Sequence, residues 1–346
     1  MSAGSAPPGP LVDGFGRVAR DLRVSLTDRC DLRCSYCLPA EGLPWLPRDD
    51  VLTDDEVVRL VRVAVERLGV REVRFTGGEP LLRRGLEGVV AATAALRRAD
   101  GTPTATSLTT NALGLDRRAR ALAAAGLGRV NVSLDTLQPD RYARITRRDR
   151  LRHALAGLAA ARDAGLVPVK VNAVLLRGVN DDEAVPLLRW ALAEGYRLRF
   201  IEEMPLGPAG AWDPAQVVRA EEILDRLRSA FTLRPVDPGR RGSDPARSWT
   251  VDGADPDGPG VVGVIASVTQ PFCGACDRVR LTADGRVRSC LFGEDDADLR
   301  ALLRSGADDD AVASAWAGAV ARKGPGHAAG TLTPASASRT MSAIGG

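Results

Sequence analysis

The chain has 346 residues, of which 45% are hydrophobic and 26% are charged, and this composition is typical of a globular protein. The net charge of +3 is too small to indicate a nucleic-acid-binding protein, and no apolar run reaches the roughly 18 residues of a membrane span. The N-terminus has neither the basic nor the apolar region of a secretory signal, so we expect a cytoplasmic protein whose six cysteines stay reduced.

Residues 1–20 are rich in proline and glycine and predict a loose lead-in. The hydrophobic pattern then alternates between strand and helix about six times. It predicts strands at 22–26, 72–76, 104–110, 129–134, 167–176 and 196–202, and helices at 53–69, 83–99, 116–125, 150–164 and 181–194. This order predicts a parallel sheet with helices outside it. Polar residues follow several of the strands, at the edge where barrel-like sheets carry their active sites.

The pattern changes near residue 205. A helix is predicted at 216–229, a strand at 261–269, and a hairpin around Asp284 and Gly285 in "RLTADGRVRSCLF". The chain is also longer than one hydrophobic core usually covers. We therefore expect three parts: the lead-in at 1–20, a main α/β domain at 21–230, and a C-terminal α+β module at 231–346.

The cysteines form two groups of three, spaced C-x3-C-x2-C and C-x2-C-x13-C: Cys30, Cys34 and Cys37, and Cys273, Cys276 and Cys290. Three is the wrong number for a tetrahedral structural zinc site or for a set of disulfides. Three thiolates on a four-iron cluster leave one iron free to bind a small molecule. Zinc with a distant fourth ligand and unrelated buried thiols are alternatives, and "CGAC" also resembles half of a zinc ribbon.

Only Lys170 and Lys323 are lysines among the 47 basic residues. Lys170 lies on a predicted strand, where a lysine is costly unless it faces a polar cavity, whereas we attribute Lys323, in a polar tail, to chance. His153 fits a surface or packing role on a helix. The chain has no P-loop motif, so arginine forks and a lysine are its means of holding a triphosphate. Arg278 and Arg280, two apart on a strand, lie on one face.

Two segments carry a resemblance to a known superfamily. "RCDLRCSYCLP", with Tyr36 before the last cysteine, and "FTGGEPLLR" resemble the radical S-adenosylmethionine (SAM) superfamily. Together with "LTTN", "VNVSLDTL", "VKVN", "LRFIEEMP", "FCGACDRVRLTADGRVRSCLF" and the terminal "SAIGG", they resemble the GTP 3′,8-cyclase family of molybdenum cofactor biosynthesis. The resemblance runs in order over roughly residues 14 to 346.

The resemblance implies an incomplete TIM-type (βα)6 barrel whose open side is closed by the C-terminal module. It implies two [4Fe-4S] clusters, with SAM at the first and the guanine of GTP at the second. SAM is cleaved to methionine and a 5′-deoxyadenosyl radical, which removes the 3′ hydrogen of GTP. The sugar then adds to C8 and gives 3′,8-cyclo-7,8-dihydro-GTP. The implied partners are cyclic pyranopterin monophosphate synthase downstream and an electron donor such as flavodoxin or ferredoxin, with no nucleic acid or membrane. A monomer or homodimer is expected.

The resemblance also assigns roles to individual residues. The first cluster falls on Cys30, Cys34 and Cys37, and the second on Cys273, Cys276 and Cys290. SAM contacts fall on Tyr36, Gly78, Ser133 and Met204. GTP contacts fall on Arg23, Arg74, Thr109, Lys170, Arg278, Val279 and Arg280, with Arg199 a weaker candidate. Catalytic roles fall on Arg278, Arg280, Gly345 and Gly346.

The sequence departs from the family at two positions: Ala112 replaces a usual glycine, and Glu72 stands where relatives often carry a basic residue. The Glu72 departure leaves one phosphate contact in doubt. Two other interpretations stay open. One is a radical SAM peptide-modifying enzyme with an auxiliary cluster, although such enzymes usually carry more C-terminal cysteines. The other is a non-catalytic cluster-binding or zinc-binding module, which leaves the Gly-Gly-Glu-Pro segment unexplained.

Overall fold

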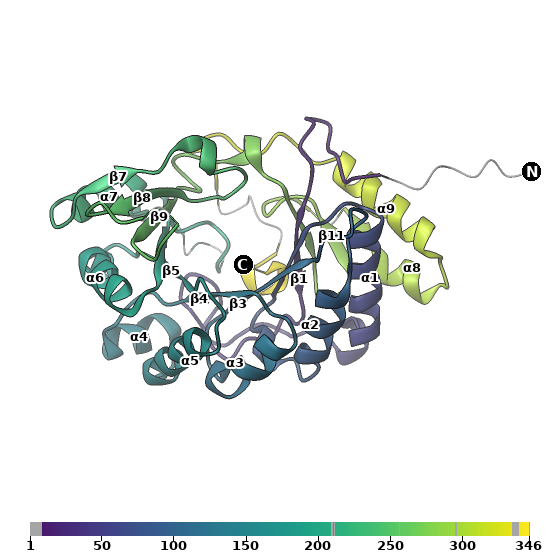
Figure 1. Ribbon diagram of the computed structural model, residues 1–346, viewed down its shortest axis with the longest axis horizontal. Coiled ribbons are helices and arrows are strands. Elements are labelled where there is room, and N and C mark those ends of the chain that lie inside the picture. The colour runs from purple at the N-terminus through teal and green to yellow at the C-terminus, as the bar shows by residue number, and fades with distance from the viewer. Residues whose placement is uncertain are drawn as a thin grey trace, which may run out of the picture.

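The computed structural model describes residues 9–208, 210, 212–255, 257–294, 296–333 and 339–345. Six parallel strands, each paired with the next in the chain, form a curved sheet: β1 Asp21–Ser25, β2 Glu72–Thr76, β3 Ala105–Thr110, β4 Arg129–Ser133, β5 Lys170–Val174 and β6 Arg197–Ile201. Figure 1 shows this sheet as an arc with helices around its outer side. These helices are α1 Asp54–Glu66, α2 Leu86–Ala95, α3 Leu115–Ala124, α4 Pro139–Thr146, α5 Leu151–Asp163, α6 Ala184–Glu194 and α7 Ala220–Arg228. The alternation of strand and helix is confirmed.

Local sequence explains how the helices begin and which face they bury. α1 starts at a capping box, in which the Thr53 hydroxyl accepts from the Glu56 amide and the Glu56 carboxylate accepts from the Thr53 amide. Its apolar side chains recur at helical spacing, and Val57, Leu60 and Val61 are fully buried against the sheet. Apolar helix faces of this kind build the main core between the helices and the outer side of the strands.

The C-terminal part of the chain extends both edges of the arc. β9 Val261–Ile265 pairs in parallel with β6, and β8 Arg247–Val251 and β7 Leu233–Pro235 follow it outward. On the other edge, β10 Arg278–Leu281 pairs in parallel with β1, followed by β11 Arg286–Arg288 and β12 Ala297–Asp298. The expected hairpin at Asp284 and Gly285 joins β10 to β11 and is confirmed. The fold is thus a partial TIM-type barrel whose sides continue into a C-terminal module.

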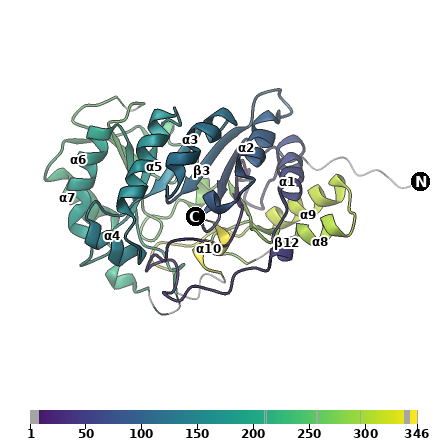
Figure 2. The ribbon, with the colours of Figure 1, turned by 90° about the horizontal axis from the view of Figure 1, so that it is seen from below.

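Four helices were not predicted from the sequence: α4, α8 Leu299–Arg304, α9 Asp309–Ala321 and α10 Met341–Ile344. α8 and α9 lie beside α1 in both views of the ribbon (Figures 1 and 2). Side chains of Asp298 and Asp308 cap their N-termini. α10 carries the C-terminus into the middle of the barrel (Figure 1). No described helix is long and apolar enough to cross a membrane.

The lead-in is less loose than its composition predicts. Leu11 is fully buried in the main core, and its amide donates to the Leu68 carbonyl over 3.2 Å. Val12 and Val18 form a β-bridge, and the Arg17 guanidinium reaches the C-terminal module. Residues 9–20 therefore join the two ends of the chain.

Candidate active site

Three arginines lie side by side across three adjacent strands. Arg23 on β1 is the register partner of both Arg280 on β10 and Arg74 on β2. Burial lowers the pKa of Arg23 well below its usual value and that of Arg280 to about 10, and the neighbouring arginines add to the effect. The buried Nε of Arg23 makes no hydrogen bond to the described residues. Enclosed cations packed against one another are unfavourable unless an anion joins them.

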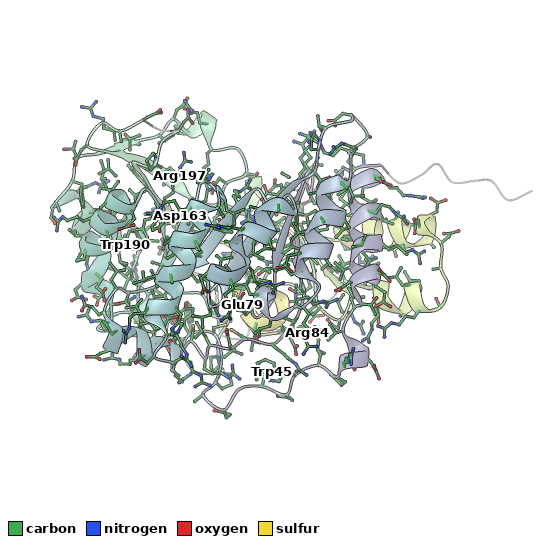
Figure 3. The ribbon with its side chains drawn as sticks, turned by 60° about the horizontal axis from the view of Figure 1, so that its bottom comes forward. Trp45, Glu79, Arg84, Asp163, Trp190 and Arg197 are labelled. Atoms are coloured by element: carbon green, nitrogen blue, oxygen red, sulfur yellow. The ribbon has the colours of Figure 1, made fainter. Side chains whose placement is uncertain are left out.

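The first cysteine triplet lies in the loop after β1. The two glycines after β2 fix this loop, because a Cβ on Gly77 would lie 2.3 Å from the Thr27 carbonyl oxygen and one on Gly78 2.2 Å from that of Arg29. Glu79, 1% exposed, ties the same turn to β3 by accepting from the Thr110 hydroxyl and the Asn111 amide, both over 2.7 Å. Figure 3 labels Glu79 toward the middle of the molecule.

The thiols of the first triplet are enclosed and uncharged by themselves. Burial raises the pKa of Cys30 and of Cys37 to about 12 and that of Cys34 well above its usual value. No disulfide joins them. A soft, positively charged metal centre is the partner that keeps such thiols deprotonated, so the donor set fits an iron–sulfur cluster. Among the described residues, no three cysteine, histidine or acidic side chains are placed to hold one metal ion.

Tyr36 lies between the first triplet and the barrel interior. Its hydroxyl donates to Asp135 Oδ2 over 2.8 Å, and Asp135 Oδ1 accepts from the Val174 amide over 2.9 Å. Asp135 is buried, which raises the pKa of its carboxyl to about 6. Tyr36, Ser133 and Met204, three of the four expected SAM contacts, line one cavity of about 250 Å³. The fourth, Gly78, acts on the loop from outside that cavity.

The second triplet lines the same cavity. Cys273 begins a 3-10 turn, Cys273–Ala275, Cys276 directly follows that turn just before β10, and Cys290 follows β11. A hydrogen bond with His327 lowers the pKa of Cys273. Burial acts to raise the pKa of Cys276, but Lys323 and Arg278 outweigh it and lower that pKa. Thiols that ionise readily next to cations are suited to metal ligation.

Parallel pairing places the two triplets at opposite ends of β1. The first triplet follows the carboxyl end of β1, and the amides of Arg20 and Asp21 at its other end donate to the carbonyl of Asp277, next to Cys276. At a rise of about 3.3 Å per residue, β1 separates these ends by about 13 Å. Thr109, Arg74 and Arg280 line the cavity between them.

Beyond the second triplet the cavity opens into a basic chamber of about 810 Å³. Its ten cationic side chains are those of Arg17, Arg20, Arg23, Arg71, Arg74, Arg129, Lys170, Arg199, Arg241 and Arg278, and its four acidic ones are those of Asp21, Glu72, Asp244 and Asp277. Burial lowers the pKa of Lys170 to about 8, although Asp244, 3.8 Å away, acts in the opposite direction. This excess of positive charge fits a polyanion such as a triphosphate.

The departure at Glu72 has a structural counterpart in this chamber. Its carboxylate accepts from Arg74 over 2.9 Å and from Arg129, and it also accepts from the Ser107 hydroxyl over 3.0 Å. Burial acts to raise the pKa of Glu72, but Arg74 and Arg129 outweigh it and hold that pKa at about 2. Glu72 thus occupies two arginines of the chamber.

The tail lies against Ser25 and Thr76 at the carboxyl ends of β1 and β2. Ile344 is fully buried, and the Gly345 carbonyl accepts a hydrogen bond from Arg280. Gly345 has φ +75, and a Cβ there would lie 2.5 Å from Thr76 Cγ2 and 2.6 Å from Ser25 Oγ. Gly346 lies outside the described residues, so its expected role is not addressed by the structure.

Two expected substrate contacts take different positions from the rest. The Val279 side chain is buried in the core on the other face of β10, so only its backbone faces the cavity side of the strand. Arg199, the weaker candidate, lines both cavities and donates to Asn131 Oδ1 and Asn172 Oδ1, each over 3.0 Å. Arg199 therefore lines both cavities, as the stronger candidates Arg23, Arg74 and Arg278 do.

Sequence reasoning missed several residues of the site. Asp135 directly follows a predicted strand, and that position was a usable signal. Lys323 was attributed to chance in a polar tail, and this was wrong: it is 5% exposed and contacts Cys276. The scarcity of lysine was the signal for it. Nothing in the local sequence marked Arg17 or His327 as site residues, because each contacts the second triplet only in the tertiary structure.

Comparison with known proteins shows which family the chain belongs to. Residues 24–191 match the model of the radical SAM superfamily, and residues 196–329 match the model described as Molybdenum Cofactor Synthesis C. A GTP 3′,8-cyclase of Streptomyces coelicolor is 58% identical, covering 97% of this chain and 96% of that protein. One of Corynebacterium glutamicum is 56% identical, covering 97% and 89%. The chain belongs to the GTP 3′,8-cyclase family.

A solved structure supports the fold of this family member. Streptococcus suis SuiB bound to S-adenosylmethionine matches with a TM-score of 0.53 at 15% identity, over 80% of this chain and 62% of that one. At this identity the likeness concerns the partial barrel alone. The family assignment does not favour the peptide-modifying enzyme, because near-full-length relatives share the name GTP 3′,8-cyclase. It does not favour the non-catalytic module either, because the Gly-Gly-Glu-Pro turn has a defined place beside the first triplet.

Proposed function

We propose that the cavity between the two triplets binds SAM at the first and GTP at the second, and that this chain performs its family's reaction there. The reaction converts GTP to (8S)-3′,8-cyclo-7,8-dihydro-GTP in the first step of molybdenum cofactor biosynthesis. The single observation that carries the proposal is that one cavity is lined both by Tyr36 beside the first triplet and by all three cysteines of the second.

The chain's residues divide the work by position. Cys30, Cys34 and Cys37 would hold one [4Fe-4S] cluster, and Cys273, Cys276 and Cys290 the other. When bound, the first cluster supplies the electron that cleaves SAM, and the second supplies an iron with an open position for the guanine. Tyr36, Ser133 and Met204 enclose SAM from the loop after β1, from β4 and from the segment after β6. The two glycines after β2 keep the first loop in place.

Substrate positioning falls to the arginine row and the basic chamber. Arg23, Arg74 and Arg280 reach the cavity from adjacent strands, and Lys170 and Arg278 face the chamber. We assign the triphosphate to this chamber because bidentate guanidinium contacts suit phosphate oxygens. Thr109 lines the cavity between the two ends of β1, and we assign it to the ribose of GTP. The Gly345 carbonyl orients Arg280, which gives the tail a role in alignment.

The finer context of the reaction is also proposed. We place the enzyme in the cytoplasm, as a monomer or homodimer, with flavodoxin or ferredoxin as electron donor. Cyclic pyranopterin monophosphate synthase would take the product on. The support is the family membership together with two triplets of free, partly exposed thiols, which a reducing compartment preserves.

The test uses two groups of alanine variants of the full chain, reconstituted anaerobically with iron and sulfide. Replacing Cys30, Cys34 or Cys37 should abolish formation of 5′-deoxyadenosine, since a ligand is lost from a site with only three. Replacing Cys273, Cys276 or Cys290 should keep the first cluster and lose the cyclised product. Cyclisation retained at one cluster's worth of iron would contradict the role given to the second triplet.

A further inference from the structure

Residues 323–327, which follow α9, lie directly on the second triplet. Gly326 has φ +104, and a Cβ there would lie 2.3 Å from Cys273 Cβ and 2.6 Å from its Sγ. His327 Nε2 donates to the Ser267 carbonyl over 2.8 Å, and its Nδ1 lies 3.7 Å from Cys273 Sγ. Only a glycine lets the segment approach the cysteine this closely.

The lead-in fixes this segment against the cysteine turn. Arg17 pairs with Asp13 over 2.6 Å, and its guanidinium donates to the carbonyls of Cys273 over 2.8 Å and Pro325 over 3.0 Å, and also to that of Gly324. One side chain thus ties the triplet and residues 323–327 together. These contacts set the position of the segment relative to the triplet, although Gly324, Pro325 and Gly326 themselves are exposed.

Lys323 is the charged member of the segment. It is 5% exposed, and its Nζ lies 2.9 Å from the Arg278 carbonyl, 3.4 Å from the Cys276 carbonyl and 3.6 Å from Cys276 Sγ. Among the described residues no carboxylate forms an ion pair with it. A buried ammonium group needs an opposite charge nearby. Of its three partners, only the Cys276 sulfur becomes an anion, when it ligates metal.

The second triplet has two cationic side chains beside one of its thiols. Lys323 Nζ lies 3.6 Å from Cys276 Sγ, and Arg278 Nη1 lies 3.8 Å from it. A reduced cluster carries one more negative charge than an oxidised one, so nearby cations favour reduction and nearby carboxylates oppose it.

We propose that Lys323 sets the reduction potential of the second cluster, by a charge-assisted contact with Cys276 that holds this potential above the value the same site has without it. The inference rests on the proposed function, which places a cluster at this triplet. Lys323 touches a ligand and not the substrate, so it is a positioning residue. Its charge keeps the second cluster easier to reduce.

The experiment measures the midpoint potential of the second cluster by itself. The full-length chain with Cys30, Cys34 and Cys37 all changed to alanine is reconstituted anaerobically, its iron is counted, and it is titrated under EPR detection. Lys323→Met, Lys323→Arg and Arg322→Met are made in this background. Arg322 is the matched control: it is an adjacent, exposed cation whose guanidinium donates to the Asp296 carbonyl.

We expect Lys323→Met to shift the oxidised-to-reduced equilibrium about tenfold toward the oxidised form, equivalent to a midpoint lower by about 59 mV for one electron. Lys323→Arg should recover most of the shift, and Arg322→Met should leave the midpoint unchanged. An unchanged midpoint in a fully loaded Lys323→Met variant overturns the proposal, as does an equal shift in Arg322→Met.

Two further results distinguish a failure of the Lys323 proposal from a failure of the proposed function. If Lys323→Met does not load iron, Lys323→Gln, which keeps a neutral donor, is titrated in its place and judged by the same criterion. If the parent background itself holds no cluster, the failure lies with the second triplet's assigned role and not with Lys323 alone, and both proposals fall.

Discussion

The Gly345→Ala substitution tests whether the docked tail serves the reaction. At φ +75 an alanine is strained by about 1–2 kcal/mol relative to its preferred conformations. Its Cβ would also lie 2.5 Å from Thr76 Cγ2 and 2.6 Å from Ser25 Oγ, and such overpacking costs about 1–3 kcal/mol. The docked position therefore loses about 2–5 kcal/mol, and since each 1.4 kcal/mol is tenfold, the equilibrium constant for docking falls at least about twentyfold.

Because the tail is the last element of the chain, this cost falls on docking and leaves the barrel folded. We expect both clusters and SAM cleavage to be nearly unchanged, while cyclised product per 5′-deoxyadenosine drops at least about tenfold, as Arg280 loses the Gly345 carbonyl. The assay is anaerobic product quantification for wild type, Gly345→Ala and a chain ending at Ile344. Wild-type coupling in the truncated chain would refute the reasoning, and recovery on adding a short peptide ending in Gly-Gly would support it.

Three further predictions concern charge in the cavity. The Lys170 pKa of about 8 means that its charge is lost as pH rises through 8, so KM for GTP should rise about tenfold between pH 7 and 9. Lys170→Arg should flatten that profile. Glu72→Gln frees Arg74 and Arg129 from the carboxylate, so KM for GTP should fall roughly tenfold, equivalent to about 1.4 kcal/mol. An unchanged KM would contradict this prediction. Asp135→Asn disturbs the acceptor of the Tyr36 hydroxyl and should raise KM for SAM about tenfold at unchanged iron content, measured by SAM cleavage rates.

The features that sequence alone predicted are those that repeat locally. The strands alternate with helices because apolar residues change from a period of two to a period of 3.6, and this change is visible in the residues themselves. The cysteine spacings are equally local. The parallel sheet with helices outside it is confirmed, and the two triplets lie where loops follow or precede a strand.

The helices that were missed lack a strong local pattern. α9 is rich in alanine, whose small side chains blur the contrast between its two faces. α4 and α10 are short, and isolated helices of that length are unstable without tertiary contacts. α10 forms where Ile344 is buried in the barrel, a condition that the sequence of the tail does not contain.

Contacts between distant residues were beyond the sequence for a different reason. Lys323 and Cys276 are 47 positions apart, and Arg17 and Cys273 are 256 apart. Nothing in either local sequence specifies the partner, because only the folded chain brings the segment after α9 and the segment before β1 to the turn before β10. The rarity of lysine marked Lys323 as unusual, yet it gave no information on where the residue would lie.

The parallel pairing of β10 with β1 is the step that turns two separate triplets into one site. Had β10 paired antiparallel, the turn that carries Cys273 and Cys276 would lie at the same end of β1 as Cys30, Cys34 and Cys37. In the observed register that turn lies at the opposite end, about 13 Å away along β1. The same register sets Arg280 beside Arg23, so the arginine row and the separation of the triplets have one cause. The proposed placement of the substrate needs both, since its base is assigned to the second triplet and its phosphates to the chamber beyond.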